Sequence, residues 1–362
     1  MSKTKVVVAM SGGVDSSMAA ALLKEQGYDV IGVTMQIWQP GSPEVEGGCC
    51  SLSAVEDARR VCHKLDIPHY VMNFRSMFEQ KVINYFVNEY VAGRTPNPCI
   101  ACNRHIKFEG LLTKARGLGA EFIATGHYAR VFYDQERGRY LLAKAKDQSK
   151  DQTYALYSFS QEQLAHTLLP LANYQKKSEI REMAKQLGLR VFNKPDSQEI
   201  CFVTEDSYKE FIEEKAGDRI KPGPFLDMAG NVLGTHQGLA YYTVGQRKGL
   251  GLALGKPMYV VALDTERNAV ILGENDAVFS SGLLAEDLNL ILMPELTGPL
   301  EVEAKIRYSA PLAKATITPV DNGKVKVEFE NLQRAVTPGQ AVVFYQGDLV
   351  VGGATIIKAL KD

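Results

Sequence analysis

Two groups of residues in this 362-residue chain have types and spacing that suit chemistry: a glycine-rich turn and a small set of cysteines. Residues 9–16 read Ala-Met-Ser-Gly-Gly-Val-Asp-Ser and follow the β-branched run 6–8. Adjacent glycines let a backbone turn tightly against a ligand, and the N-terminus of a following helix favours an anion. The turn lacks the Gly-Lys-Ser/Thr ending of a Walker A loop. It is predicted to bind pyrophosphate, and a glycine-rich connection without a ligand stays open at this point.

The six cysteines are too sparse for a disulfide framework in a chain of this length. Cys99 and Cys102 form a CxxC pair in the turn-rich stretch 95–103, and Cys201 lies much further along the chain. A CxxC pair is half of a Cys₄ zinc site, which needs a second pair. The other three are taken as structural by default: Cys49, Cys50 and Cys62. The CxxC pair and Cys201 are therefore the thiols to consider for redox, persulfide or metal chemistry.

The elements that must position these residues alternate along the first half of the chain. The expected strands span 6–8, 30–35, 69–73 and 121–125, and the expected helices span 16–26, 53–65, 76–91, 108–117 and 177–187. Repeated βα units predict a parallel sheet with helices on both faces. Ligands bind such sheets at the carboxyl ends of the strands, which is where the glycine-rich turn lies.

After about residue 205 glycine and proline become frequent and short alternating runs appear. These runs span 258–263, 269–272, 301–306, 324–329 and 340–345, and Asp-Asn-Gly at 321–323 predicts a hairpin turn. We therefore expect an α/β parallel-sheet domain over 1–205, followed by two smaller domains. A central β-rich domain would span 206–280. The C-terminal part, 281–362, has the pattern of a small barrel or sandwich, of which we expect a β-barrel.

The net charge and the apolar runs limit the kinds of partner that the chain can have. Lys and Arg total 41 against 42 for Asp and Glu, a formal net charge of −1. A protein held on nucleic acid by general positive charge is excluded, so a nucleic-acid partner would need a local basic face or recognition by shape. No run of about 18 apolar residues supports a membrane span, and the start of the chain lacks a secretory pattern. A cytoplasmic protein with reduced thiols is expected.

The hexapeptide Ser-Gly-Gly-Val-Asp-Ser at 11–16 resembles the signature of the PP-loop ATP pyrophosphatases. Six further motifs occur in the order found in tRNA-specific 2-thiouridylases, to which nearly the whole chain is similar. They are Thr-Pro-Asn-Pro at 95–98, Ala-Thr-Gly-His-Tyr at 124–128, Lys-Asp-Gln at 150–152, Ile-Cys-Phe at 200–202, Thr-Val-Gly-Gln-Arg-Lys-Gly at 243–249 and Ile-Arg-Tyr at 306–308.

The resemblance implies ATP-dependent 2-thiolation of uridine 34, the wobble base, in the tRNAs for Lys, Glu and Gln. ATP, with Mg²⁺ held in part by Asp15, would adenylate the uracil C2 oxygen, and sulfur would then displace AMP. In the family the cysteine that matches Cys201 carries a persulfide from an upstream donor, such as a cysteine desulfurase or a sulfur relay protein. The cysteine that matches Cys102 reduces that persulfide to release sulfide, or resolves the intermediate through a disulfide with Cys201.

The resemblance also implies binding residues, carried over position by position. The ATP site would consist of Ala9, Met10, Ser11, Gly12, Gly13, Val14, Asp15, Ser16, Met35 and Gly126. The tRNA contacts would be Asn97, Pro98, Cys99, His127, Lys150, Asp151, Gln152, Arg307, Tyr308 and Gln340. Chemistry at C2 needs an unstacked base, which a loop nucleotide provides at low cost.

Cys99 departs from the family pattern, because many members have Asp there. Cys99, Cys102 and Cys201 would supply three thiolates able to hold a [4Fe–4S] cluster with one open iron; the other interpretation is a tolerated substitution. Two other functional classes stay open: a PP-loop synthetase acting on a small molecule, and a non-catalytic RNA-binding protein with a degenerate nucleotide loop. The paired thiols and the β-rich second half weigh against the first class, and the intact loop weighs against the second.

Overall fold

The computed structural model describes residues 3–37, 51–196, 200–203, 208–253, 255–321 and 323–361. The chain forms two compact units, which are described separately. The first unit consists of Met1–Val82, Cys99–Glu205 and Asp348–Val350, and the second of Ile83–Pro98, Asp206–Gly347 and Val351–Asp362. Within the described residues, no helix has the length and apolar character needed to cross a membrane. The three-domain division with boundaries at 205 and 280 stays a prediction.

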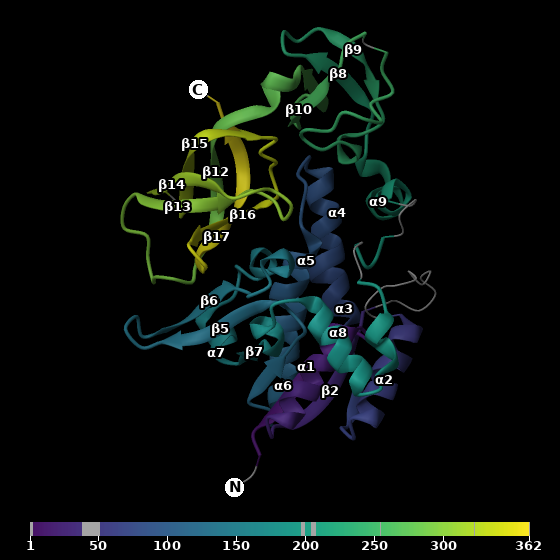
Figure 1. The fold of residues 1–362 in the computed structure, drawn as a ribbon. Coiled ribbons are helices and arrows are strands. Elements are labelled where there is room, and N and C mark those ends of the chain that lie inside the picture. The colour runs from purple at the N-terminus through teal and green to yellow at the C-terminus, as the bar shows by residue number, and fades with distance from the viewer. Residues whose placement is uncertain are drawn as a thin grey trace. The chain divides into compact units, whose positions relative to one another are not determined.

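A sheet of parallel strands forms the centre of the first unit, in the order β3-β2-β1-β4-β7. The strands are β1 (Lys5–Ala9), β2 (Asp29–Gln36), β3 (His69–Asn73), β4 (Phe122–Ala124) and β7 (Thr167–Leu168). β1 pairs with β2 on one side and β4 on the other, so the direction of winding changes between β1 and β4. This switch brings the turns after β1 and β4 together at the ligand-binding edge of the sheet. The predicted parallel sheet is confirmed (Figure 1).

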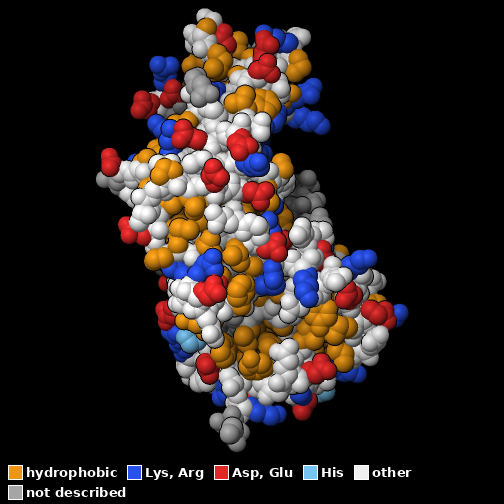
Figure 2. Space-filling view, turned by 60° about the vertical axis from the view of Figure 1, so that its left-hand side comes forward, with side chains coloured by type: hydrophobic (Ala, Val, Ile, Leu, Met, Phe, Trp, Pro, Cys, Tyr) orange, Lys and Arg blue, Asp and Glu red, His pale blue; other side chains and the backbone are white. Residues whose placement is uncertain are grey.

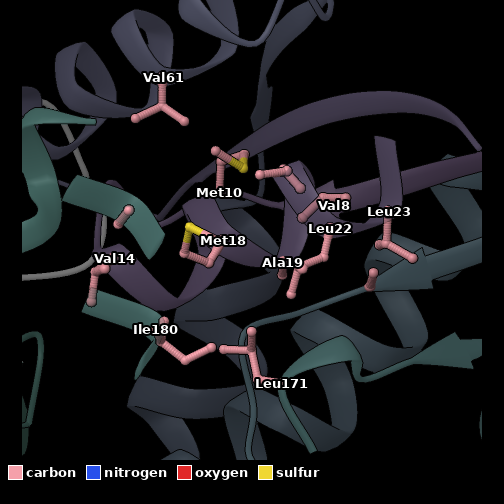
Figure 3. Packing of buried hydrophobic residues seen from close by; sticks show 14 of the residues in the cluster. Val8, Met10, Val14, Met18, Ala19, Leu22, Leu23, Val61, Leu171 and Ile180 are labelled. Carbon is pink, nitrogen blue, oxygen red and sulfur yellow. The ribbon is translucent and has the colours of Figure 1, made fainter. Parts of the chain in front are cut away.

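Helices pack around this sheet, and a hairpin projects from it (Figure 1). The helices are α1 (Val14–Glu25), α2 (Leu52–Lys64), α6 (Leu111–Gly117), α7 (Gln161–Ala165) and α8 (Lys177–Gln186), and the hairpin strands are β5 (Ala129–Asp134) and β6 (Arg139–Lys144). α1 is buried along most of its length. Figure 3 shows its side chains Met18 and Leu22 beside Met10 and Val8, with Val61 of α2 and Ile180 of α8 in the same cluster. A helix buried on several faces holds its N-terminus in a fixed place against the sheet.

Residues 75–91 and 98–117 are helical, but each stretch contains a π-helical segment. The first comprises α3 (Arg75–Phe78), the π segment Glu79–Ile83 and α4 (Asn84–Val91); the second comprises α5 (Pro98–Ala101), the π segment Cys102–Gly110 and α6. The sequence predicts a turn-rich loop through 103, and this is wrong from Pro98 onward. Proline suits the first helical position, because its missing N–H would have no partner there.

The second unit is rich in β structure, as predicted. After α9 (Tyr208–Ala216) a sheet forms in the order β10-β11-β8-β9, from β8 (Gly223–Asp227), β9 (Val232–His236), β10 (Tyr259–Asp264) and β11 (Ala269–Gly273). Its core includes Phe225, Val260 and Leu272. A barrel follows, built from β12 (Phe279–Leu290), β13 (Leu300–Lys305), β14 (Ala313–Val320), β15 (Lys324–Arg334), β16 (Ala341–Gln346) and β17 (Leu349–Leu360).

The barrel closes because β12 pairs with both β15 and β17, so the predicted barrel is confirmed. β14 and β15 are antiparallel neighbours whose pairing reaches Val320 and Lys324. This is the hairpin that Asp-Asn-Gly predicts; Asn322 itself lies outside the described residues. Within the described residues, closure pairs the two end strands of the barrel sheet, β12 and β17, with each other.

A substitution at Gly32 tests the packing of α2 on the sheet. A Cβ on Gly32 would lie 2.5 Å from the Cys62 Sγ and 3.2 Å from the Met10 Cγ, both in the core. We expect Gly32→Ala to lower the free energy of unfolding by about 1–3 kcal/mol, as overpacking does. Chemical denaturation measures this, with Gly117→Ala, where a Cβ meets nothing within 4 Å, as the control.

If the clash with the thiol is the cause, Cys62→Ala should remove it. The double variant should then lose less stability than the two single variants together, a coupling that a double-mutant cycle detects. Additive losses would show that Gly32 is constrained by something other than Cys62.

Candidate functional site

The glycine-rich turn between β1 and α1 packs so closely on α2 that a side chain at Gly12 would not fit. Gly12 has φ +67°, and a Cβ there would lie 2.3 Å from the Ala54 carbonyl oxygen. The Ser16 hydroxyl accepts a hydrogen bond from the Ser11 N–H at 3.1 Å and donates to the Gly13 carbonyl at 3.2 Å. These bonds close the turn around the start of α1, whose N-cap, Gly13, provides no side-chain cap. The first N–H groups of α1 therefore suit an anion.

The turn after β4 packs directly on this loop. A Cβ on Gly126 would lie 2.6 Å from the Asp15 carbonyl carbon and 2.7 Å from the Ser16 nitrogen, so only glycine permits the approach. Met35 lies near the end of β2, and the adjacent Thr34 hydroxyl donates to the Met10 carbonyl at 3.0 Å. The structure thus brings Gly126 against the loop and fixes the strand that carries Met35 to it. Their role in ATP binding stays a prediction.

Two lysines beside the loop were missed by sequence reasoning. The Lys177 ammonium, with its side chain only 11% exposed, donates to Asp15 Oδ2 at 2.6 Å and to Asp196 Oδ1 at 2.5 Å. The Lys194 ammonium donates to the Gly12 carbonyl at 3.2 Å and to Asp57 at 2.8 Å. Both lysines are remote from the loop in sequence and belong to no motif. Their sequence signal is merely a lysine at the start of the predicted helix 177–187.

Asp196 and Tyr128 complete this charged cluster. Burial alone would raise the pKa of Asp196, but hydrogen bonds from Lys177 and Lys150 outweigh it and hold the pKa below its ordinary value. The Tyr128 hydroxyl donates to Asp15 at 2.8 Å, and burial, followed by the Asp15 charge, raises the pKa of this phenol. Asp196 is therefore charged and Tyr128 protonated at neutral pH.

The predicted tRNA contacts at 150–152 all make bonds inside the first unit. Lys150 lies 3.2 Å from Asp196. Asp151 accepts from the Thr153 hydroxyl at 2.6 Å, and Gln152 accepts from the Tyr128 N–H at 2.9 Å. Of the three side chains, Gln152 fixes the segment to the turn that carries Tyr128. Whether they also contact RNA stays a prediction.

His127 lies in the same turn, between Gly126 and Tyr128. Its Nδ1 is 2.7 Å from the Thr125 hydroxyl, and its ring centroid is 5.7 Å from that of Phe108. Burial and, to a smaller extent, the Lys107 charge lower the pKa of His127 well below its ordinary value. The imidazole is therefore neutral at physiological pH and can stack or share a hydrogen bond, but it brings no positive charge to a phosphate.

The cysteines divide as follows. Cys102 and Cys201 are both half-buried in the first unit, and Cys99 is exposed. Cys102 begins the π segment Cys102–Gly110, and such segments occur frequently at functional sites. Cys62 is buried, and burial raises the pKa of its thiol to about 12, which makes it unreactive. Cys49 and Cys50 lie outside the described residues.

A cluster held by three cysteines does not fit this geometry. Across the described ranges, no group of three or more His, Cys, Asp or Glu side chains is placed to hold a metal ion. The structure therefore does not bring Cys99, Cys102 and Cys201 together as cluster ligands, although that expectation follows from the sequence alone. Mg²⁺ differs, because it commonly uses one or two carboxylates together with substrate phosphates; Asp15 in the loop fits that pattern.

The remaining predicted contacts belong to the second unit. Gln340 donates its side-chain amide to the Thr95 carbonyl at 2.8 Å, in the segment just before Asn97 and Pro98. Arg307 donates to the Arg334 carbonyl at 3.0 Å and to the Ala335 carbonyl at 2.6 Å. Tyr308 is half-exposed, with the Lys305 ammonium 5.4 Å from its ring centroid. On the face drawn in Figure 2, basic and acidic side chains are interspersed without a large area of one sign.

The neutral state of His127 can be tested through stability. Because the pKa of His127 is lowered in the folded protein, the unfolded chain binds a proton below about pH 6.5 that the folded chain does not. We expect the free energy of unfolding to fall below pH 6.5, by up to about 1.4 kcal/mol per pH unit more in the wild type than in His127→Gln. Chemical denaturation of both proteins from pH 8 to pH 5 measures this. Parallel curves would show that the imidazole protonates as readily in the folded state.

Three family models match successive parts of the chain. A tRNA methyl transferase HUP domain matches residues 4–205, a tRNA methyl transferase PRC-barrel domain matches residues 209–274, and an aminomethyltransferase β-barrel domain matches residues 280–356. These ranges follow the order of the α/β unit, the four-stranded sheet and the barrel along the chain.

Full-length relatives carry a common name. A tRNA-specific 2-thiouridylase MnmA of Acetivibrio thermocellus is 61% identical over 359 residues, which cover 98% of this chain and 100% of the relative. A protein of the same name from Moorella thermoacetica is 62% identical over 352 residues, covering 97% and 98%. Among solved structures, a 4-thiouridine synthetase–RNA complex with bound ATP aligns with 60% of this chain and 51% of its own, at 19% identity and a TM-score of 0.33. That likeness is too weak to carry an argument.

Proposed function

The chain belongs to the family of tRNA-specific 2-thiouridylases, and we propose from this premise that it is an ATP-dependent tRNA sulfurtransferase. It replaces the C2 oxygen of a uridine with sulfur. The uridine is the wobble base, position 34, of the tRNAs for Lys, Glu and Gln. The reaction needs ATP with Mg²⁺, two thiols of different roles and an unstacked base.

One observation carries the proposal: the first unit contains both a tight glycine turn at the start of an uncapped helix and two half-buried cysteines. Gly12 and Gly126 lack space for a side chain where the turn, α2 and the β4 turn meet. Cys102 and Cys201 belong to this same unit. A nucleotide loop alone would suit a small-molecule synthetase equally well, so the cysteines are what favour sulfur transfer over that alternative.

The residues around the loop suit a triphosphate. Backbone N–H groups at the start of α1, together with Lys177 and Lys194, supply positive potential where phosphate charge would develop. Asp15 would help to hold Mg²⁺, with the nucleotide supplying further ligands. Lys177 is well placed to exchange partners, because its ammonium already lies between two carboxylates and a phosphate would offer it another anion.

Adenylation makes the C2 oxygen a competent leaving group. The terminal sulfur of a Cys201 persulfide then attacks C2, and the bond from C2 to the adenylated oxygen breaks, so AMP leaves with the electron pair. The Cys102 thiolate next attacks the Cys201 Sγ, which forms a disulfide between the two cysteines and releases the 2-thiouridine. An external thiol reductant must return that disulfide to two thiols. In the other sequence of steps, Cys102 first reduces the persulfide and the released sulfide attacks C2.

The partners are tRNA and an upstream donor that loads sulfur onto Cys201, such as a cysteine desulfurase or a sulfur relay protein. The tRNA contacts would come from Asn97, Pro98, Cys99, His127, Lys150, Asp151, Gln152, Arg307 and Tyr308. Gln340, for which the resemblance also implies a tRNA contact, has its amide bonded to the Thr95 and Pro96 carbonyls. The net charge of −1, and the interspersed charges on the face drawn in Figure 2, support binding through a few local contacts and shape, with a modest dependence on salt.

The proposal is tested by measuring pyrophosphate release and thiolation with and without unmodified tRNA. We expect release that depends on tRNA, thiolation that is lost in Cys102→Ser and in Cys201→Ser, and full activity in the control Cys62→Ala. A small-molecule synthetase would release pyrophosphate without tRNA, and a non-catalytic RNA-binding protein would release none. Thiolation that survives both substitutions would reject the proposed sulfur chemistry.

Lys177→Met tests the role of the buried ammonium. Without it, among the described residues, Asp15 would face the phosphates without an ion-pair partner, while Asp196 would keep only Lys150 and Arg181. We expect the KM for ATP to rise about tenfold or more, the size of one lost charge-assisted contact, and the rate of pyrophosphate release to fall. Lys185→Met, an exposed lysine on the same helix, is the matched control. An unchanged KM for ATP would show that Lys177 serves the fold alone.

A further inference from the structure

The segment Thr95–Pro96, which directly precedes the helix of Cys99 and Cys102, is held by the connection that leads into β16. The Thr95 N–H donates to the Pro338 carbonyl at 2.8 Å. In return, the Gln340 side-chain amide donates to the Thr95 carbonyl at 2.8 Å and to the Pro96 carbonyl at 3.4 Å. All of these residues belong to the second unit. Two stretches of chain 245 positions apart are thus joined by reciprocal bonds.

This connection is itself firmly placed. Gly339 donates its N–H to the Ile356 carbonyl, and the Ile356 N–H donates to the Gln340 carbonyl, both at 2.8 Å. Gly339 has φ +87°, and a Cβ there would lie 2.9 Å from the Thr95 nitrogen. The backbone of Gln340 is therefore fixed by the barrel. Its segment lies so close to the segment of Thr95 that only glycine fits at position 339.

The chemistry of the segment explains why an amide is needed. Pro96 and Pro98 have no N–H, so this stretch of backbone carries more acceptors than donors. A carboxamide nitrogen carries two N–H donors and can serve two neighbouring carbonyls, which a carboxylate or an alkyl group cannot do. Thr243 adds a further tether, because the Thr95 hydroxyl lies 3.4 Å from the Thr243 hydroxyl.

We propose that Gln340 is a positioning residue, which orders the backbone before Asn97 and thereby sets the start of the helix that carries Cys102. The inference rests on the proposed function and deepens it: the Gln340 amide is already committed to Thr95 and Pro96, so its loss acts through the loop at the target base. Misplacing such a loop slows the chemistry of bound substrate more than it weakens binding.

The test separates turnover from binding. Gln340→Ala and Gln340→Glu are compared with the wild type in filter binding of tRNA and in single-turnover thiolation at saturating ATP and tRNA. We expect the rate at saturation to fall about tenfold or more, with the Kd for tRNA changed by less than about twofold. Gln346→Ala is the matched control, because the Gln346 amide also donates to a backbone carbonyl, that of Glu301 at 3.1 Å, within the barrel.

A tenfold rise in the Kd with an unchanged rate at saturation would overturn the inference and make Gln340 a direct tRNA contact. Unchanged Kd and rate would overturn it as well. Hydrogen exchange of the peptide around residues 90–104 gives a second readout that does not depend on activity. We expect faster exchange in Gln340→Ala than in Gln346→Ala, and equal exchange would overturn the positioning role. If the wild type thiolates no tRNA, the proposed function fails, while the exchange experiment still decides whether Gln340 orders this loop.

Discussion

The first unit depends on one constraint: the backbone of the turn after β4 must lie directly against the backbone of the turn after β1. Gly126 lies so near Asp15 and Ser16 that a methyl group would overlap the main chain, and Gly12 is equally close to Ala54. This contact brings the start of α1, the end of β4 and α2 together at one point. The parallel sheet and the buried helix α1 keep that point rigid. In a preorganised site of this kind, the groups that stabilise a charge need little reorganisation when the charge develops.

Charge at this point is balanced locally. Asp15 and Asp196 share the ammonium of Lys177, and Asp196 also faces Lys150 and Arg181. The protein therefore keeps cations at the loop without a strongly basic composition, which agrees with a net charge of −1. An arriving polyanion would replace intramolecular carboxylates as the partner of these cations. Binding then becomes an exchange of ion pairs, for which little new charge must be desolvated.

Sequence reasoning recovered what depends on local pattern. The run Val6–Val8, the glycine pair and the alternation of strands and helices predict the parallel sheet and the turn that the structure contains. It failed at Pro98, where proline was interpreted as a turn signal although it begins a helix. It also missed Lys177 and Lys194, because ion pairs across more than a hundred positions leave no local periodicity. The bond from Gln340 to Thr95 is hidden for the same reason.

The roles of the cysteines were harder to read than the fold, because a CxxC spacing is compatible with a zinc site, a cluster or a redox pair. The structure places Cys99 and Cys102 in one continuous helical stretch, whereas the spacing alone does not indicate whether Cys201 joins them. Three-dimensional placement decides, and the described residues contain no three-ligand group. The sequence identified Cys102 and Cys201 as candidate reactive thiols, and their proposed role as sulfur carrier and partner thiol stays a prediction.

A chain of hydrogen bonds connects the glycine-rich turn after β1 to the helix of Cys102 within the first unit. Asp15 accepts from the Tyr128 hydroxyl, and Tyr128 and Gln152 exchange backbone and side-chain bonds. The Ala155 N–H donates to the Gln152 carbonyl at 3.0 Å, and the Asn103 amide donates to the Ala155 carbonyl at 2.9 Å. Asn103 directly follows Cys102 and is buried, so its bond fixes the thiol's backbone to the same segment that holds Tyr128.

The Asn103 side chain therefore links two parts of the first unit. Its amide donates to the Ala155 carbonyl, and within the described part of the chain its buried Oδ1 makes no hydrogen bond to another protein group. An apolar side chain would lose the bond to Ala155, and with it the link between the backbone beside Cys102 and the segment that holds Tyr128. For the proposed thiol chemistry this link would matter, because misplacing a reacting atom by about 1 Å slows a reaction strongly.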